Sequence, residues 1–442
     1  MAEYTEMSMC DLGRAIGAGE IDPRDLAAAY LDKARVHPYA ERIYARMMED
    51  RAMAEAEAAH ARAENGVRRG LLDGVPVSWK DLFDTAGVAT EAGSALLQDR
   101  IPTRDAEVLR RASQAGLVAL GKTHMSELAF SGLGLNPITA TPPCINDLDA
   151  VPGGSSSGAA ASVAFGLAAG SIGSDTGGSV RIPSAWNDLV GLKTTAGRIP
   201  LDGVVPLAAA FDTIGPLVKT VEDAAESFAI LDGSPAPDLK GATLKGKRLL
   251  VLDNVVFDEI RDAPRVAFKA AVEKFRDAGA EVVQAPIDAV TEAMDLSAIL
   301  FTTEAYAEWR DYIEARPDAM YPRILERFRG GGAYNGADFV AGWKKLTHLR
   351  AAYLRATAGY DAVLLPTAPN LPPKAERLLT DAEYYVTENL LTLRNTRVGN
   401  LMGLCALTLP TGVPSCGIIL QAPPMQEAAL LRLGAAAEQV LS

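Results

Sequence analysis

Histidine and cysteine are scarce in this 442-residue chain, and basic residues are outnumbered by acidic ones. Because the cysteines are few, far apart and without CxxC spacing, they indicate neither a disulfide framework nor a zinc site, and we expect them to be reduced and buried. No HExxH motif or other metal-ligand spacing occurs, which argues against a metal hydrolase. Most hydrolytic mechanisms use an imidazole, but few are available here. These scarce residues are His37, His60, His124, His348, Cys10, Cys144, Cys405 and Cys416.

Excess positive charge and long apolar runs are also missing. The formal net charge is -13, which disfavours non-specific attraction to nucleic acid or anionic lipid. The N-terminus has no basic stretch followed by an apolar one, and no uncharged apolar run reaches the roughly 18 residues of a membrane span. We therefore predict a soluble, cytoplasmic protein with no nucleic-acid or membrane partner.

What is present indicates an α/β protein. The chain is 48% hydrophobic and 22% charged, which is typical of a globular protein with a substantial core. Residues 1–65 are predicted to be helical. One helix in this segment is expected to have Asp22 as its N-cap and Pro23 at its first position. From residue 72 onward, helical and strand patterns alternate, which predicts a buried, mostly parallel or mixed sheet.

No internal repeat or low-complexity linker divides the chain. Residues 233–246 are the one plausible boundary between two halves, but the strands that follow could join the same sheet. We therefore predict a single domain over 1–442, with the helical segment 1–65, a central portion at 66–232 and a second half at 233–442.

Two neighbouring stretches, 152–161 (PGGSSSGAAA) and 173–186 (GSDTGGSVRIPSAW), concentrate glycine and serine. Such composition is typical of flexible linkers, but it also suits the floor of a catalytic site. The first stretch runs directly into an apolar, small-residue helix predicted at 159–169, and the second follows a strand-like segment. These flanks favour the catalytic interpretation.

A Walker A pattern at 116–123 (GLVALGKT) is misleading. A phosphate-binding loop needs a strand before it and a flexible glycine loop. Here a helical pattern precedes it and the variable positions are the apolar LVAL, which predict a strand. Nucleotide binding is therefore disfavoured.

A GxSxG pattern at 154–158, centred on Ser156, is misleading in the same way. A nucleophile elbow follows a buried strand and needs a later histidine. The preceding NDLDAV is polar, and the one later histidine, His348, lies in a helical pattern.

A third pattern combines Lys80 in DGVPVSWKDLFDTAG, the glycine–serine run 153–158, and GSDTGGS ending at Ser179. It resembles the amidase signature family of serine hydrolases, which carry a Ser–Ser–Lys triad. The resemblance implies a mixed β-sheet flanked by helices on both faces, with 66–232 as the catalytic core. It extends over several blocks in order: 72–94, 120–132, 152–185 and 191–225, with weaker matches at 360–369 and 397–414.

By matching position, the resemblance makes Ser179 the nucleophile, Ser155 the proton relay and Lys80 the final base. A lysine acts as a base only when neutral, and burial disfavours its charged form. The apolar GVPVSWK segment would provide that burial. Judged without the serines, Lys80 would instead be expected to reach solvent or to pair with Asp81 or Asp84.

The remaining expected site residues surround this triad, and among them Asp175 and Arg181 match family positions. Backbone N–H groups from Thr176, Gly177, Gly178 and Ser179 are expected to form an oxyanion hole, because glycine allows close approach and unusual backbone angles. A cis peptide is implied at Ser155. Residues expected to support the loops are Ser156, Asp175 and Arg181, and those expected to border the substrate cleft are Met125 and Trp186.

The implied reaction is hydrolysis of a small carboxylic amide through an acyl-enzyme, with release of ammonia or an amine and no cofactor. The chain departs from the family at 186–188 and 136–152, two segments expected to border the cleft, so the substrate is left open. Hydrolytic relatives often pair, which leaves a homodimer open. The alternatives are the catalytic A subunit of a glutamine-dependent tRNA amidotransferase and a catalytically idle binding protein.

Overall fold

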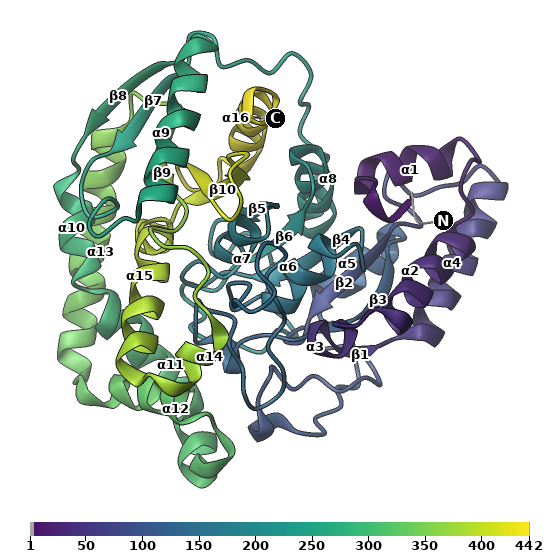
Figure 1. The fold of residues 1–442 in the computed structure, drawn as a ribbon, viewed down its shortest axis with the longest axis horizontal. Coiled ribbons are helices and arrows are strands. Elements are labelled where there is room, and N and C mark those ends of the chain that lie inside the picture. The colour runs from purple at the N-terminus through teal and green to yellow at the C-terminus, as the bar shows by residue number, and fades with distance from the viewer. Residues whose placement is uncertain (1–3, 442) are drawn as a thin grey trace.

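The computed structural model describes residues 4–441, and this part of the chain forms one mixed sheet of eleven strands (Figure 1). The strand order is β1-β3-β2-β4-β6-β5-β10-β11-β9-β7-β8. Strands from all three predicted segments of the chain lie in this one sheet. Their bounds are β1 (Tyr44–Met47), β2 (Pro76–Lys80), β3 (Val118–Thr123), β4 (Gly170–Ser174), β5 (Val190–Lys193), β6 (Ile214–Val218), β7 (Arg248–Leu252), β8 (Glu281–Ala285), β9 (Ala362–Pro366), β10 (Cys405–Pro410) and β11 (Gly417–Ala422).

Helices surround the sheet, so the alternating pattern in the sequence correctly predicts an α/β fold. In Figure 1 the N-terminal helices lie at one end of the molecule and α10, α11, α12 and α13 lie at the other. The bounds are α1 (Met9–Gly17), α2 (Pro23–Val36), α3 (Ala40–Ile43), α4 (Glu49–Glu64), α5 (Glu107–Ala115), α6 (Ser157–Ala164), α7 (Arg181–Trp186), α8 (Val221–Asp232), α9 (Asp262–Asp277), α10 (Asp288–Met294), α11 (Ser297–Ala315), α12 (Pro322–Arg329), α13 (Gly336–Thr357), α14 (Ala375–Thr380), α15 (Ala382–Leu401) and α16 (Glu427–Leu441).

The prediction that residues 1–65 are helical is wrong at one point. Asp22 caps α2 as expected, its side chain accepting from the Arg24 N–H. Between α3 and α4, however, β1 pairs antiparallel with β3 at the edge of the sheet. Pairing with the main chain of β3 is a long-range effect that outweighs the local preference of this short segment.

Two central strands, β5 and β6, were not anticipated from the sequence. Both contain glycine, and β6 also contains proline, residues that usually argue against a strand interior. Gly215 is required by close packing, because a Cβ atom there would lie 1.7 Å from the Leu192 carbonyl oxygen. Burial between neighbouring strands therefore outweighs the weak strand preference of glycine and proline in these two segments.

The Walker-like segment is a strand, as its apolar residues predict. Residues 118–123 form β3, which is buried throughout, and Lys122 Nζ donates to the Phe83 carbonyl at 2.7 Å and to Thr90 Oγ1 at 2.8 Å. A lysine held inside the sheet in this way cannot cradle a phosphate. All four cysteines are free and buried, also as predicted.

Leu407 in β10 connects the middle of the sheet to the C-terminal helix. It is fully buried, and a Cβ atom built on Gly434 of α16 would lie 2.1 Å from Leu407 Cδ2. Leu407→Ala is therefore expected to lower the free energy of unfolding by about 2–5 kcal/mol, because it leaves a cavity between β10 and α16. Urea denaturation followed by circular dichroism measures this change.

Leu379→Ala is the matched control, because Leu379 is 46% exposed. Its expected effect is within about 0.5 kcal/mol. Equal losses in the two variants would contradict the packing role assigned to Leu407.

Candidate active site

The site lies at the ends of two parallel neighbouring strands, β2 and β4. In open α/β sheets, ligands bind beyond the carboxyl ends of the strands. Lys80 is the last residue of β2 and Ser174 is the last residue of β4, and every residue of both strands is buried. The sheet therefore places an amine and a hydroxyl together in a dry environment.

Lys80 is fully buried among hydroxyl groups. Its Nζ lies 2.7 Å from Ser155 Oγ and 2.8 Å from Ser174 Oγ. Burial lowers the pKa of Lys80 to about 7, against a smaller opposing effect of Asp175 and Asp212. A substantial fraction of this amine is consequently neutral near pH 7.

The alternative environment considered for Lys80, an ion pair with Asp81 or Asp84, is not what the chain adopts. Asp81 Oδ1 lies 2.8 Å from Arg46 Nη1, and Asp84 Oδ1 lies 2.6 Å from Arg100 Nη1. Both nearby carboxylates are thus engaged by arginines, which leaves Lys80 with uncharged hydrogen-bond partners.

Ser174 was missed at the sequence level, although it stands in the second glycine–serine stretch. A neutral amine has two N–H donors and one lone pair. If the lone pair accepts from the Ser155 hydroxyl, an N–H group can donate to Ser174 Oγ at 2.8 Å. Ser174 therefore orients Lys80 toward Ser155 and is a positioning residue.

The two glycine–serine stretches lie against each other. Ser155 lies two residues before the start of α6, and the Gly154–Ser155 peptide is cis, as the family resemblance implied. The Ser156 N–H donates to the Ser179 carbonyl at 3.3 Å, and Ser156 Oγ donates to the Ser174 carbonyl at 3.2 Å. These bonds hold the Ser155 loop beside the loop that carries Ser179.

Asp175 and Arg181 form a fully buried ion pair that shapes the loop around Ser179. Arg181 donates to both carboxylate oxygens of Asp175, with Nη2 to Oδ1 at 2.8 Å and Nε to Oδ2 at 2.9 Å. The Asn400 side chain of α15 also donates to Asp175 at 3.0 Å. Arg181 and these hydrogen bonds hold the pKa of Asp175 well below its usual range despite its burial.

The backbone donors predicted for an oxyanion hole are not all available. The Gly178 N–H donates to Asp175 Oδ1 at 2.8 Å, so the prediction for Gly178 needs correction. Gly178 instead shapes the loop, because its φ is +139° and a Cβ atom there would lie 2.2 Å from Thr396 Oγ1. Within residues 4–441, the N–H groups of Thr176, Gly177 and Ser179 have no hydrogen-bond acceptor.

Thr176 is fixed by a buried carboxylate. Its Oγ1 donates to Asp212 Oδ1 at 2.5 Å, and Asp212 Oδ2 also accepts from the Leu207 N–H at 2.9 Å. Burial raises the pKa of Asp212, while the bond from Thr176 opposes that rise. Asp212 was not anticipated, because it lies well outside the loop that it supports.

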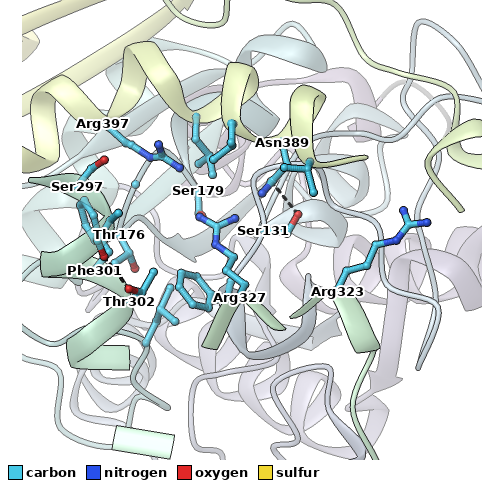
Figure 2. A pocket seen from close by; sticks show the side chains of 18 of the residues that line it. Ser131, Thr176, Ser179, Ser297, Phe301, Thr302, Arg323, Arg327, Asn389 and Arg397 are labelled. Carbon is cyan, nitrogen blue, oxygen red and sulfur yellow. Dashed lines mark hydrogen bonds between the residues drawn. The ribbon is translucent and has the colours of Figure 1, made fainter. Parts of the chain in front are cut away.

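A cavity of about 390 Å³ opens onto Ser179 (Figure 2). Its floor comes from the Ser179 loop, and its walls come from α11, α12 and α15 together with residues 129–131. The lining residues are Ala129, Phe130, Ser131, Thr176, Gly177, Ser179, Leu207, Ser297, Ala298, Phe301, Thr302, Arg323, Glu326, Arg327, Tyr385, Val386, Asn389, Leu390, Leu393 and Arg397.

Met125 and Trp186, the two residues predicted to border the cleft, do not line this cavity. Both are fully buried. Trp186 packs in a core cluster with Leu133 and Ile182, and the Met125 carbonyl accepts from the Asn136 side chain at 2.8 Å. Trp186 was expected at the cleft because its segment departs from the family pattern after Ser179, but α7 turns its aromatic side chain into the core.

The walls of the cavity come from the second half of the chain, and sequence reasoning missed them. Asn389, Leu393 and Arg397 recur every four residues along α15 and therefore share one face. Arg323 and Arg327 have the same spacing on α12. This periodicity was a usable signal, but arginines at such spacing more often mark a solvated helix face.

The described part of the chain contains no cluster of three or more His, Cys, Asp or Glu side chains arranged to hold a metal ion. None of the helices within residues 4–441 is long and apolar enough to cross a membrane.

The sequence matches a family model and named relatives over most of its length. Residues 25–431 match the family model described as Amidase. The chain is 36% identical to 2-amino-5-chloromuconic acid deaminase of Comamonas testosteroni, over 88% of this chain and 87% of that protein. It is 32% identical to the A subunit of the glutamyl-tRNA(Gln) amidotransferase of Anaeromyxobacter sp. (strain K), over 99% of this chain and 97% of that protein.

Solved structures of amidases have the same fold as this chain. A crystal structure of an amidase superposes with a TM-score of 0.88 and 28% identity, over 99% of this chain and 100% of that one. Native peptide amidase from Stenotrophomonas maltophilia gives a TM-score of 0.82 and 27% identity, over 99% of this chain and 97% of that one. With the family model matching most of its length, the chain belongs to the amidase family of amide-hydrolysing enzymes.

Proposed function

We propose that the protein hydrolyses a small carboxylic amide through an acyl-enzyme formed on Ser179. The observation that carries this proposal is the buried Lys80 amine, 2.7 Å from Ser155 Oγ and with a pKa lowered to about 7. Ser179 lines the cavity, and its carbonyl accepts from the N–H of Ser156, the residue after Ser155, at 3.3 Å. A serine hydroxyl is a weak nucleophile until a nearby base accepts its proton, and Lys80 acting through Ser155 provides that base.

In the first half of the reaction, Ser179 Oγ forms a bond to the amide carbonyl carbon. Its proton passes to Ser155 Oγ, whose own proton passes to Lys80 Nζ. The carbonyl oxygen becomes an oxyanion, which accepts hydrogen bonds from the N–H groups of Thr176, Gly177 and Ser179. Each such donor contributes on the order of 3 kcal/mol to the transition state.

In the second half, the C–N bond breaks and the leaving nitrogen takes a proton from Ser155, which is restored by Lys80. Water then attacks the acyl carbon through the same relay and frees Ser179. Asp175, Arg181 and Ser156 hold the two loops in place during these steps. The relative named a deaminase supports ammonia as the released product here.

The A subunit of a tRNA amidotransferase is the second candidate function. The match to such a subunit over 99% of this chain favours it. The formal net charge of -13 and the departures from the family at 136–152 and 186–188 disfavour it. Hydrolysis of simple amides by the purified protein without a partner would distinguish a stand-alone amidase from an amidotransferase subunit.

The single-domain division, a homodimer and a cytoplasmic location stay predictions.

Ser179→Ala is expected to lower kcat/KM by about 10⁴-fold or more, because it removes the nucleophile. Lys80→Ala is expected to lower it by about 10²–10⁴-fold, because it removes the base. Ammonia release from a panel of amides measures both effects, and a fluorophosphonate adduct located by mass spectrometry identifies the reactive serine.

Ser157→Ala is the control for these variants. Ser157 lies two residues beyond Ser155, and its Oγ donates to the His124 carbonyl at 3.3 Å rather than to Lys80. It should retain activity. A fluorophosphonate adduct on Ser156, or full activity in Ser179→Ala, would refute the assignment of the nucleophile.

Activity should depend on pH through Lys80. Because burial lowers its pKa to about 7, the amine loses its proton as pH rises through that value, and only the neutral amine accepts a proton. We therefore expect kcat/KM to rise about tenfold per pH unit below pH 7 and to level off above it. A profile that falls with rising pH across this range would contradict the role of Lys80 as a base.

A further inference from the structure

Two arginines in the cavity have no hydrogen-bond or ion-pair partner within residues 4–441. Arg327 of α12 and Arg397 of α15 both line the cavity that contains Ser179. Within residues 4–441, neither side chain donates a hydrogen bond or forms an ion pair, and Arg327 Nη1 is a buried donor without an acceptor. The Arg327 guanidinium lies over the Phe130 ring, 4.4 Å from its centroid. Both side chains are half-buried, and a guanidinium partly removed from water is costly unless something binds to it.

The electrostatic setting of this pair favours an anion. Burial lowers the pKa of Arg327 to about 10 and that of Arg397 to about 9, and the charge of Arg327 contributes to the second shift. Both remain protonated at neutral pH, so two positive charges face each other. The carboxylate that lines the cavity, Glu326, is ion-paired with neither. A bound anion would relieve this repulsion.

Neighbouring arginines on the same helices have partners. Arg323 donates to the Leu379 carbonyl at 3.0 Å, and in Figure 2 it points away from the other two. Arg329 Nη2 lies 2.7 Å from Glu314 Oε2. Arg394 donates to the Val256 carbonyl at 3.3 Å. Among the arginines of α12 and α15 in the described residues, those without a hydrogen-bond or ion-pair partner are thus the two whose guanidinium groups extend toward Ser179 in Figure 2.

We propose that Arg327 and Arg397 bind a carboxylate in the acyl portion of the substrate, so that the substrate is the monoamide of a short dicarboxylic acid. This inference rests on the proposed amidase function. The planar guanidinium fork matches carboxylate geometry, and paired donors add specificity. The walls of the cavity also include apolar side chains, among them Phe301 and Leu393, which suit the short carbon chain that separates the carboxylate from the amide.

The test compares substrates that differ in charge but hardly in shape. Succinamate and glutaramate are each paired with the neutral amide in which an isopropyl group replaces the carboxylate, 4-methylpentanamide and 5-methylhexanamide. The wild-type ratio of kcat/KM, anionic to neutral, is expected to be about 100 or more. Arg327→Gln and Arg397→Gln should each lower this ratio at least about tenfold, and Arg397→Lys should restore part of it.

Arg329→Gln and Arg394→Gln are matched controls on α12 and α15, and the ratio should not change in them. A structural defect would lower both rates and leave the ratio intact, so the ratio reports recognition alone. The proposal is overturned by a wild-type ratio near one, by a ratio that neither Arg327→Gln nor Arg397→Gln lowers, or by controls that lower it equally.

A binding measurement separates this proposal from the proposed function. Malonate, succinate, glutarate and adipate are titrated by calorimetry into Ser179→Ala, with and without Arg327→Gln or Arg397→Gln. Binding of at least one dicarboxylate that weakens about tenfold or more on loss of either arginine supports the inference even if no test amide is hydrolysed. Absence of binding by all four overturns it, whereas Ser179-dependent hydrolysis of the neutral amides would still support the amidase function.

Discussion

Keeping the amine of Lys80 away from water is the constraint on which the arrangement of this site depends. The residue ends a fully buried strand, its nearest partners are hydroxyl groups, and the carboxylates next to it in sequence are occupied by arginines. A carboxylate in direct contact would favour the ammonium form and remove the base. The fold therefore gives Lys80 two serine hydroxyls as hydrogen-bond partners, whereas a lysine at the surface commonly pairs with a carboxylate.

Asp175 presents the opposite solution for a buried ionisable group. It stays charged because Arg181, Asn400 and the Gly178 amide surround it with donors. Its negative charge in turn opposes the effect of burial on Lys80. The pKa of Lys80 is therefore set by a balance between desolvation and a carboxylate kept at a distance. The Asp175 carboxylate also accepts from the Gly178 N–H, which fixes the loop and leaves that N–H unable to donate to an oxyanion.

Sequence reasoning succeeds where the signal is local and fails where distant segments meet. Lys80 and Ser155 were assigned by their resemblance to a family pattern, and the strand and helix patterns around them are regular. β1 could not, because it forms only through pairing with β3. Trp186 was misplaced since the direction of a side chain on α7 is decided by packing. Arg327 and Arg397 were missed because they lie on separate helices, where the chain gives no hint that they converge.

α15 has two roles in this structure: it lines the cavity and it holds the loop that carries Ser179. One face carries Asn389, Leu393 and Arg397 into the cavity, and the adjacent positions Thr396 and Asn400 bond to the loop that holds Ser179. The helices that complete the cavity, α11 and α12, make no such bonds to the loop. A change in substrate preference therefore disturbs the Ser179 loop least when it occurs on α11 or α12, whereas a substitution on α15 must also preserve the alignment of Ser179, the proposed nucleophile.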